Sequence, residues 1–183
     1  MEPSSAIGDP AGTSPLSMRA VRFEDVPQVL RLIRGAVDRG CHAHYGPRQR
    51  DAVYASYAAT LFVDTHAPYE TIAAERDGRL VAVAQLDPAD ARLRALFVDA
   101  RLHGRGVGSA LLAHVEGRAR ARGCELLRGS MALNAVRFYL RAGFRPCAGP
   151  ERLIGRAIWV PVVRMEKALP VRPTSTGPQP AAR

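Results

Sequence analysis

Residues 98–109 read Val-Asp-Ala-Arg-Leu-His-Gly-Arg-Gly-Val-Gly-Ser, and a helical pattern follows at once. A glycine-rich turn at the start of a helix leaves several backbone N–H groups without partners inside the helix. Together with the positive end of the helix dipole, these groups can bind phosphate, and glycine lets the backbone approach the phosphate oxygens closely. Arg101 and Arg105 could add charged contacts. The alternative interpretation is a tight turn that needs glycine only for its geometry.

Two common phosphate-binding motifs do not fit these glycines. The P-loop requires a lysine directly after its last glycine, and no lysine follows here. The dinucleotide fingerprint requires a third glycine where this chain has Leu111, after Gly106 and Gly108. The sequence therefore argues against a P-loop nucleotidase and against a nicotinamide-dependent dehydrogenase.

Apolar periodicity and turn residues predict alternating strands and helices around this turn. Asp77-Gly78 is a strong hairpin signal, and Pro161 indicates an edge or a bulge in the last strand. The order predicts an α/β (α+β) fold with a mostly antiparallel, mixed sheet of about six to seven strands and about four flanking helices. We expect a first helix that Asp25, with Pro27, opens, and further helices over 51–62, 107–122 and 134–142. We expect strands over 16–21, 71–74, 80–86, 93–98, 126–128, 144–147 and 158–166.

Length and composition predict one domain in 183 residues. We place it at residues 18–169, between disordered tails at 1–17 and 170–183 that are rich in proline and glycine, and Met18 is a candidate natural start. The chain shows no signal-peptide pattern and no apolar run of the ~20 residues that a membrane span needs, so a cytoplasmic protein is expected. Three widely spaced cysteines argue against a disulfide framework and a zinc site, and no metal is expected.

The net charge of +9 raises nucleic acid as a partner, but its distribution does not favour one. Lys167 is the only lysine, and the arginines are spread along the chain in ones and twos. No basic run of the kind that marks a nucleic-acid surface occurs. The arginine bias is better explained by a GC-rich coding sequence.

Three segments in order resemble the GNAT superfamily of acyl-CoA N-acyltransferases. Leu96-Phe97-Val98 followed by His-Gly-Arg-Gly-Val-Gly-Ser-Ala-Leu-Leu at 103–112 is similar to the central motif, in which Gln or Arg precedes the glycines. Residues 133–144, Leu-Asn-Ala-Val-Arg-Phe-Tyr-Leu-Arg-Ala-Gly-Phe, resemble the second coenzyme segment, and 162–167, Val-Val-Arg-Met-Glu-Lys, resemble a common final strand. The resemblance covers about residues 19–169.

The resemblance implies direct transfer of an acetyl group from acetyl-CoA to a primary amine, on a small molecule or a peptide, in a ternary complex. The arm of the coenzyme would pair with the backbone of Phe97 and Val98 and reach Asn134, and an N–H near Phe97 would polarise the thioester. Tyr139 would protonate the departing thiolate as general acid. The pyrophosphate would be bound by the N–H groups of His103, Gly104, Arg105, Gly106, Val107, Gly108 and Ser109.

Plainer interpretations remain for two of these residues: Asn134 as a helix N-cap, and Tyr139 as a core aromatic. The chain also departs from the family pattern, because His103 replaces Gln or Arg and the strand 93–98 carries no carboxylate to serve as general base. Glu75 is the candidate base, with His42 and His44 as alternatives.

By loop position, His66, Tyr69 and Tyr45 are candidates for the acceptor side, again by resemblance. A non-catalytic acyl-CoA-binding domain and a basic nucleic-acid-binding module remain alternative functions. The sequence fixes neither the acceptor, the length of the acyl group nor the oligomeric state, and a homodimer stays open.

Overall fold

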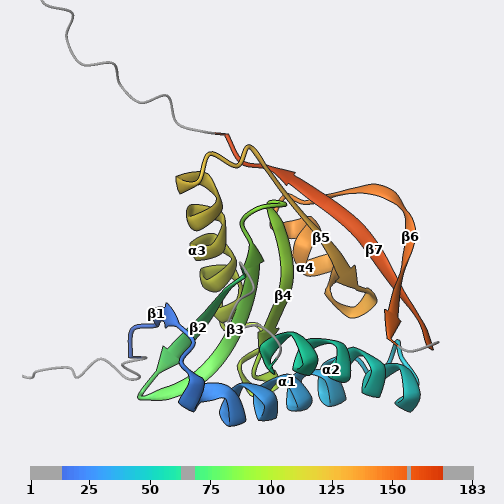
Figure 1. The fold of residues 1–183 in the computed structure, drawn as a ribbon, viewed down its shortest axis with the longest axis horizontal. Helices are drawn as coiled ribbons and strands as arrows, with labels where there is room; N and C mark the ends of the chain where they lie inside the picture. The colour runs from blue at the N-terminus through green and yellow to red at the C-terminus, as the bar shows by residue number, and fades with distance from the viewer. Residues whose placement is uncertain (1–13, 63–68, 156–157, 171–183) are drawn as a thin grey trace, which may run out of the picture.

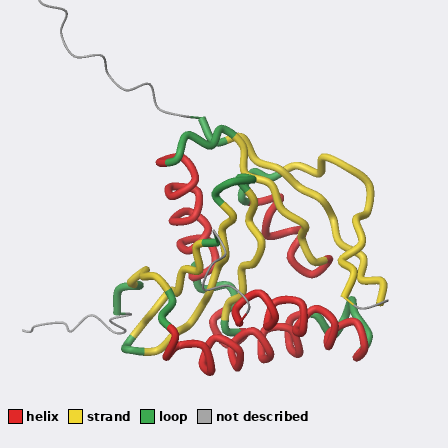
Figure 2. The backbone as a smooth tube through the Cα atoms, viewed as in Figure 1, coloured by secondary structure: helices red, strands yellow, loops and turns green. Residues whose placement is uncertain are grey.

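The computed structural model describes residues 14–62, 69–155 and 158–170, which form one mixed sheet flanked by helices (Figures 1 and 2). The predicted tails lie almost entirely outside these residues. The strands are β1 (Ser17–Ala20), β2 (Glu70–Arg76), β3 (Arg79–Asp87), β4 (Arg92–Val98), β5 (Leu126–Ala132), β6 (Arg145–Gly155) and β7 (Ile158–Ala168). The helices are α1 (Val26–Gly40), α2 (Pro47–Phe62), α3 (Val107–Ala121) and α4 (Val136–Arg141), with 3-10 turns at Phe23–Asp25, Ala100–Leu102 and Leu133–Ala135.

The strand order in the seven-stranded sheet is β1-β2-β3-β4-β5-β7-β6. All neighbouring pairs are antiparallel except β4 and β5, which are parallel. A parallel pair needs a crossover connection, and α3 supplies it. The predicted fold class is therefore confirmed.

The sheet buries a separate hydrophobic cluster on each face. Along β3, Ala82 and Ala84 pack into a cluster with α3 and α4, whereas Val83 packs into a cluster with α1 and α2. This alternation follows from the two-residue period of a strand. Helices α1 and α2 therefore cover one face of the sheet, and α3 and α4 cover the other.

Two helix expectations need correction. Helix α2 begins at Pro47 rather than at 51, because proline lacks an N–H and is well suited to a first helical position. The residue before the helix, Gly46, donates its N–H to the side-chain oxygen Oε1 of Gln49 at 2.9 Å. The expected helix over 134–142 is a 3-10 turn followed by the shorter α4, whose N-cap is Ala135. Asn134 is therefore not a helix cap.

The strands beyond α3 are longer than expected. β5 continues to Ala132, and β6 continues to Gly155. Pro161 lies in β7, which is an interior strand of the sheet. The pairing of β7 with β5 ends at Ala132 and Val162, so Pro161, the next residue, pairs only with β6. β7 is therefore an edge locally at Pro161, which a residue without an N–H tolerates.

The first strand is tied to the rest of the fold by charge. Arg19 in β1 donates to Asp25 at 2.6 Å and to Glu75 in β2 at 2.8 Å. The hydrogen bond from Arg19, aided by the Arg22 N–H, lowers the pKa of the buried Asp25 carboxyl to about 2. This cluster joins β1, β2 and the start of α1.

Candidate active site

The loop between β4 and α3 has the geometry that the glycines predict. Gly104 and Gly106 adopt left-handed φ angles of 76° and 79°, and Gly106 is the N-cap of α3 without a side-chain cap. Within the described part of the chain, no acceptor is present for the N–H groups of Gly104, Gly106, Val107, Gly108 and Ser109, whereas those of His103 and Arg105 make long bonds of 3.4 and 3.3 Å. Unpaired N–H groups at a helix start are suited to bind an anion.

The two arginines of this loop differ. Arg101 pairs with Asp99 at 2.5 Å, and its hydrogen bonds hold the pKa of the Asp99 carboxyl below its usual range. Arg105 is exposed, and no described residue forms an ion pair with it. Arg105 is therefore the cation that remains available to an anion at this loop.

A gap in the sheet lies beside the loop. β4 and β5 pair only at Arg92 with Arg128 and at Leu93 with Gly129, and beyond these residues the strands diverge (Figure 1). A cavity of about 880 Å³ runs through the divergence. It reaches from the glycine loop and α4 on one face of the sheet to Tyr45 and Tyr57 on the other.

The edge of β4 exposes alternate peptide groups to this gap. Asp99 donates its N–H to Val81 on β3 at 2.9 Å, so in antiparallel pairing residue 97 also directs its polar groups at β3. Leu96 and Val98 then direct theirs at the gap. The Val98 carbonyl oxygen points away from β3, since it lies 3.3 Å from Nε2 of the His103 ring. The sequence-based expectation for Phe97 is corrected here: its ring lines the cavity, but its N–H and C=O face β3.

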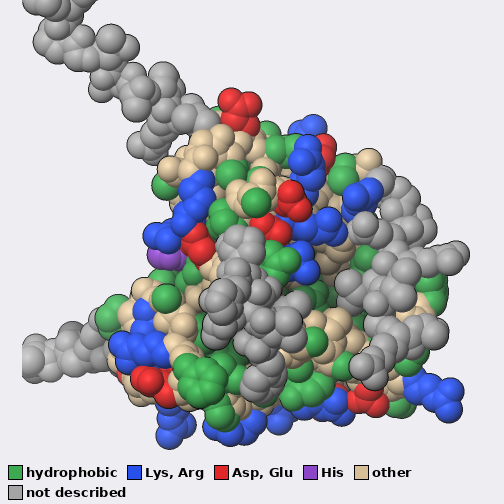
Figure 3. Space-filling model, in the orientation of Figure 1, with side chains coloured by type: hydrophobic (Ala, Val, Ile, Leu, Met, Phe, Trp, Pro, Cys, Tyr) green, Lys and Arg blue, Asp and Glu red, His purple; other side chains and the backbone are tan. Residues whose placement is uncertain are grey.

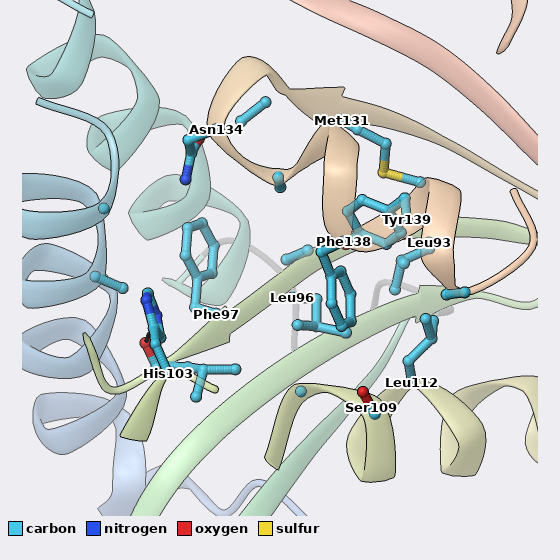
Figure 4. A pocket seen from close by; sticks show the side chains of 18 of the residues that line it. Leu93, Leu96, Phe97, His103, Ser109, Leu112, Met131, Asn134, Phe138 and Tyr139 are labelled. Carbon is cyan, nitrogen blue, oxygen red and sulfur yellow. Dashed lines mark hydrogen bonds between the residues drawn. The ribbon is translucent and has the colours of Figure 1, made fainter. Parts of the chain in front are cut away.

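Asn134 and His103 converge at one end of the cavity, next to Phe97 (Figure 4). Asn134 Oδ1 accepts the thiol proton of Cys41 at 3.4 Å. Its amide nitrogen and the His103 ring both lie close to Gly40, where a Cβ would come within 3.5 and 3.9 Å of them. Asn134 thus presents its N–H₂ group to the cavity end while Cys41 holds its oxygen.

Tyr139 lines the cavity from α4, in edge-to-face contact with Phe138 at 4.9 Å and Phe144 at 5.3 Å (Figure 4). Burial raises the pKa of its phenol well above the usual value, so the group is protonated at neutral pH. Among the described residues, its hydroxyl has no hydrogen-bond partner. A buried phenol normally finds a partner, and a ligand in the cavity can supply one.

The structure does not bring the predicted bases to the cavity. Glu75 is bonded to Arg19 near the end of β2 and does not line the cavity. His42 and His44 are exposed outside it, and the His42 ring bonds the Arg39 carbonyl at 2.8 Å. His66 lies outside the described residues. Glu116 is the only carboxylate among the described residues that line the cavity, and it pairs with Lys167 at 2.6 Å and Arg120 at 3.1 Å.

Tyr45 and Tyr69 have other roles in the structure. The Tyr45 hydroxyl lies at the cavity wall, donates to the Pro161 carbonyl at 2.7 Å and accepts the Leu133 N–H at 2.9 Å. Tyr45 thereby fastens the α1–α2 connection to the ends of β5 and β7. The ring of Tyr69 packs under the guanidinium of Arg94, 4.4 Å from its centroid.

Three cavity residues carry no sequence signal that marks them: Cys41, Tyr57 and Arg94. Tyr57 packs edge-to-face on Phe97 at 4.9 Å, and burial raises the pKa of its phenol to about 12. Burial also raises the pKa of the Cys41 thiol to about 11, so this group is a thiol and not a thiolate at neutral pH. Cys41 and Tyr57 reach the cavity from elements that are far in sequence from the glycine loop, whereas Arg94 lies in β4, the strand before that loop.

The described residues lack the patterns of a metal site and of a membrane-spanning helix. Residues 14–62, 69–155 and 158–170 contain no group of three or more His, Cys, Asp and Glu side chains placed to hold a metal ion. Nor do they contain a helix with the length and apolar character to cross a bilayer. On the visible face, acidic side chains lie between the basic ones rather than leaving one basic patch (Figure 3).

The site therefore combines a split sheet with a helix start whose N–H groups are unpaired in the described structure, and comparison with known proteins gives the family. Residues 49–169 match the model of the acetyltransferase (GNAT) domain. The chain therefore belongs to the GNAT acetyltransferase family. No curated protein sequence matches it.

Solved structures share the fold. A GCN5-related N-acetyltransferase from Rhodopseudomonas palustris is 24% identical with a TM-score of 0.78, over 87% of this chain and 99% of that one. PaiA N-acetyltransferase from Thermoplasma acidophilum, in complex with coenzyme A, is 17% identical with a TM-score of 0.66, over 84% and 99%. A ribosomal-protein-alanine N-acetyltransferase from Brucella melitensis is 22% identical with a TM-score of 0.59, over 84% and 99%.

Proposed function

We propose that the protein is an N-acetyltransferase that transfers the acetyl group of acetyl-CoA to a primary amine by direct attack in a ternary complex. The observation that carries the proposal is the cavity through the gap between β4 and β5, which joins an uncapped helix start on one side to Tyr57 on the other. A thioester carrier and an amine can enter it from opposite faces of the sheet. The coenzyme A complex of the structurally similar Thermoplasma protein supports the choice of carrier.

The pyrophosphate of the carrier would lie at the free N–H groups between Gly104 and Ser109, with Arg105 as counter-charge. Its extended arm would pair with the outward-facing peptide groups of Leu96 and Val98, as an added strand pairs with a free edge. Leu96 therefore replaces Phe97 in the predicted set. The Asn134 amide, held by Cys41, would donate to the same arm.

The reaction needs a stabilised oxyanion and an acid for the leaving group. The N–H groups at the gap edge of β4 can donate to the thioester oxygen as it gains charge. Tyr139 keeps its proton at neutral pH and has an unengaged hydroxyl, so it can protonate the departing thiolate of coenzyme A. Cys41 is a protonated thiol bonded to Asn134, which favours direct attack by the amine over an acyl-enzyme.

Glu75 is not retained as the base, because it lies away from the cavity and is bonded to Arg19. In the described part of the cavity, no carboxylate other than the paired Glu116 is present. We infer that the amine is taken up in its neutral form or loses its proton to water at the open end of the cavity. The turnover rate would then rise with pH as the fraction of neutral amine rises.

Two measurements test the proposal. Isothermal titration should show acetyl-CoA binding, and a thiol-detecting dye should report free coenzyme A only when an acceptor amine is added. Binding without acceptor-dependent thiol release, over a broad panel of amines, would instead indicate the non-catalytic acyl-CoA-binding function. Absence of binding would reject both functions.

A further inference from the structure

The acceptor side of the cavity carries an arginine with an unusual position. β4 has one extra residue relative to β3, because Gln85 pairs with Ala95 while its neighbour Leu86 pairs with Leu93. The extra residue is Arg94, which forms a β-bulge. Bulges redirect a side chain out of the normal alternation and are frequent next to functional sites.

The bulge turns Arg94 toward the α1–α2 side of the sheet. Its guanidinium lies over the Tyr69 ring, and its charge acts on Tyr57, which packs in the cluster of α1 and α2. Arg94 also lines the cavity, on the face opposite the glycine loop and α4. It therefore lies on the side from which the amine would enter.

Among the described residues, the guanidinium of Arg94 makes an ion pair with Asp87 and no hydrogen bond. The Asp87 carboxylate lies 3.9 Å away, which is beyond hydrogen-bond length. Asp87 itself accepts the N–H groups of Ala89 and Asp90 at 3.2 and 3.4 Å. In the described part of the chain, Arg94 therefore stacks on a ring while all its donors remain available, and 33% of its side chain is exposed.

Among the described residues, Asp87 is the carboxylate that forms an ion pair with Arg94, and it is not one of the residues that line the cavity. Glu116, the single carboxylate among the described lining residues, lies on α3 with Lys167 and Arg120 as partners. A second arginine, Arg92, comes from the same strand and donates to Ser130 Oγ at 2.7 Å. The described lining on the acceptor side of the cavity therefore holds a planar five-donor group and no carboxylate, and this geometry matches a carboxylate of a ligand.

We propose that Arg94 binds a carboxylate of the acceptor, so that the substrates of the enzyme are amines that carry a carboxylate, free amino acids above all. This inference rests on the proposed function, because it names the acceptor class of the same cavity. The stacking on Tyr69 and the bulge fix the guanidinium before the substrate arrives, which reduces the ordering cost of binding. A cationic amine without a carboxylate would meet the positive charge of Arg94 and would leave its donors unpaired.

The test compares acceptor pairs that differ only in the carboxylate. Free amino acids, β-alanine included, are assayed against the corresponding amino-acid amides by thiol release with acetyl-CoA. We expect kcat/KM to be about 10- to 100-fold higher for the acids, the range for a hydrogen-bonded charge pair. Arg94→Met should reduce that ratio to about one, and Arg94→Lys should keep part of it.

The matched control is Arg79→Met, at an exposed arginine in the β2–β3 hairpin that does not line the cavity. This variant should keep the wild-type ratio. The affinity of Arg94→Met for coenzyme A and its melting temperature, compared with those of wild type, report whether the variant is folded and binds the carrier. Amides or carboxylate-free amines that react as well as the acids would overturn the inference and leave the proposed function standing.

A second readout does not depend on turnover. The protein saturated with coenzyme A is titrated with N-acetyl amino acids and with their amides. Tighter binding of the acids in wild type, lost in Arg94→Met, supports the carboxylate site even if no acceptor releases thiol, in which case the proposed function fails separately. Equal or absent binding of acids and amides overturns the inference.

Discussion

Gly106→Ala tests the anion site at the head of α3 without removing a side chain. Gly106 adopts a φ of 79°, and a Cβ built there has no atom within 4 Å. The substitution therefore creates strain and no clash. Left-handed backbone costs an L-residue about 1–2 kcal/mol, so the free energy of unfolding should fall by that amount and the variant should fold.

The effect on coenzyme binding should be larger than the strain alone. Relief of the strain rotates the peptide groups on either side of Gly106, whose N–H groups lack acceptors in the described structure. A hydrogen bond to a charged group contributes about 1.5–3 kcal/mol, so loss of one N–H contact weakens coenzyme A binding about 10- to 100-fold. The dissociation constant from isothermal titration measures this directly.

The matched control is Gly78→Ala in the β2–β3 hairpin. Gly78 has a φ of 69°, and a Cβ there also has no atom within 4 Å. Its strain cost is therefore the same, but it lies outside the cavity lining. Equal dissociation constants for coenzyme A in the two variants, at equal losses of stability, would refute the assignment of the loop as the pyrophosphate site.

Three further changes separate chemistry from stability. Tyr139→Phe should retain the affinity for coenzyme A and lower kcat by about 100-fold or more, the usual contribution of a general acid; unchanged turnover in a steady-state assay would exclude that role. Gly129→Ala should lower the free energy of unfolding in urea by about 1–3 kcal/mol, because its Cβ would lie 2.9 Å from the Leu93 carbonyl at the last β4–β5 pair; full stability would show that the two strands can separate there. Arg19 lowers the pKa of Asp25 from 3.8 to about 2, so the ionised carboxylate should contribute on the order of 2 kcal/mol to the free energy of unfolding above pH 4 and lose that contribution as the pH falls toward 2. The free energies of unfolding of wild type and Asp25→Asn, from urea titrations, should therefore converge over that interval. A difference that stays constant with pH would contradict the reasoning.

Local signals were sufficient for the order of the elements and for the left-handed glycines before α3. The glycines between Gly104 and Gly108 mark the start of α3 because only glycine adopts left-handed backbone at no steric cost. Asp77 and Gly78 likewise predicted the β2–β3 hairpin correctly. These features depend on residues that are neighbours along the chain, and sequence reports such neighbours directly.

Long-range contacts decided the rest. Glu75 is a reasonable base on residue type, but Arg19, far away in sequence, occupies it. Asn134 looks like a helix cap until Cys41 is seen to bond its oxygen. The bulge at Arg94 depends on the register between β3 and β4, which no single strand encodes.

The two paired positions between β4 and β5 make the middle of the sheet its weakest seam. The strands on each side of the seam pair with one another, and across the seam the two sides are joined by α3, by the hydrogen bonds of Tyr45 and by the two hydrophobic clusters, each of which includes residues from both sides. A carrier that pairs with the β4 edge would add hydrogen bonds where β4 and β5 do not pair and would link the two sides of the sheet. Amide hydrogens on both sides of the seam should then exchange more slowly together when coenzyme A is added, including those in β7.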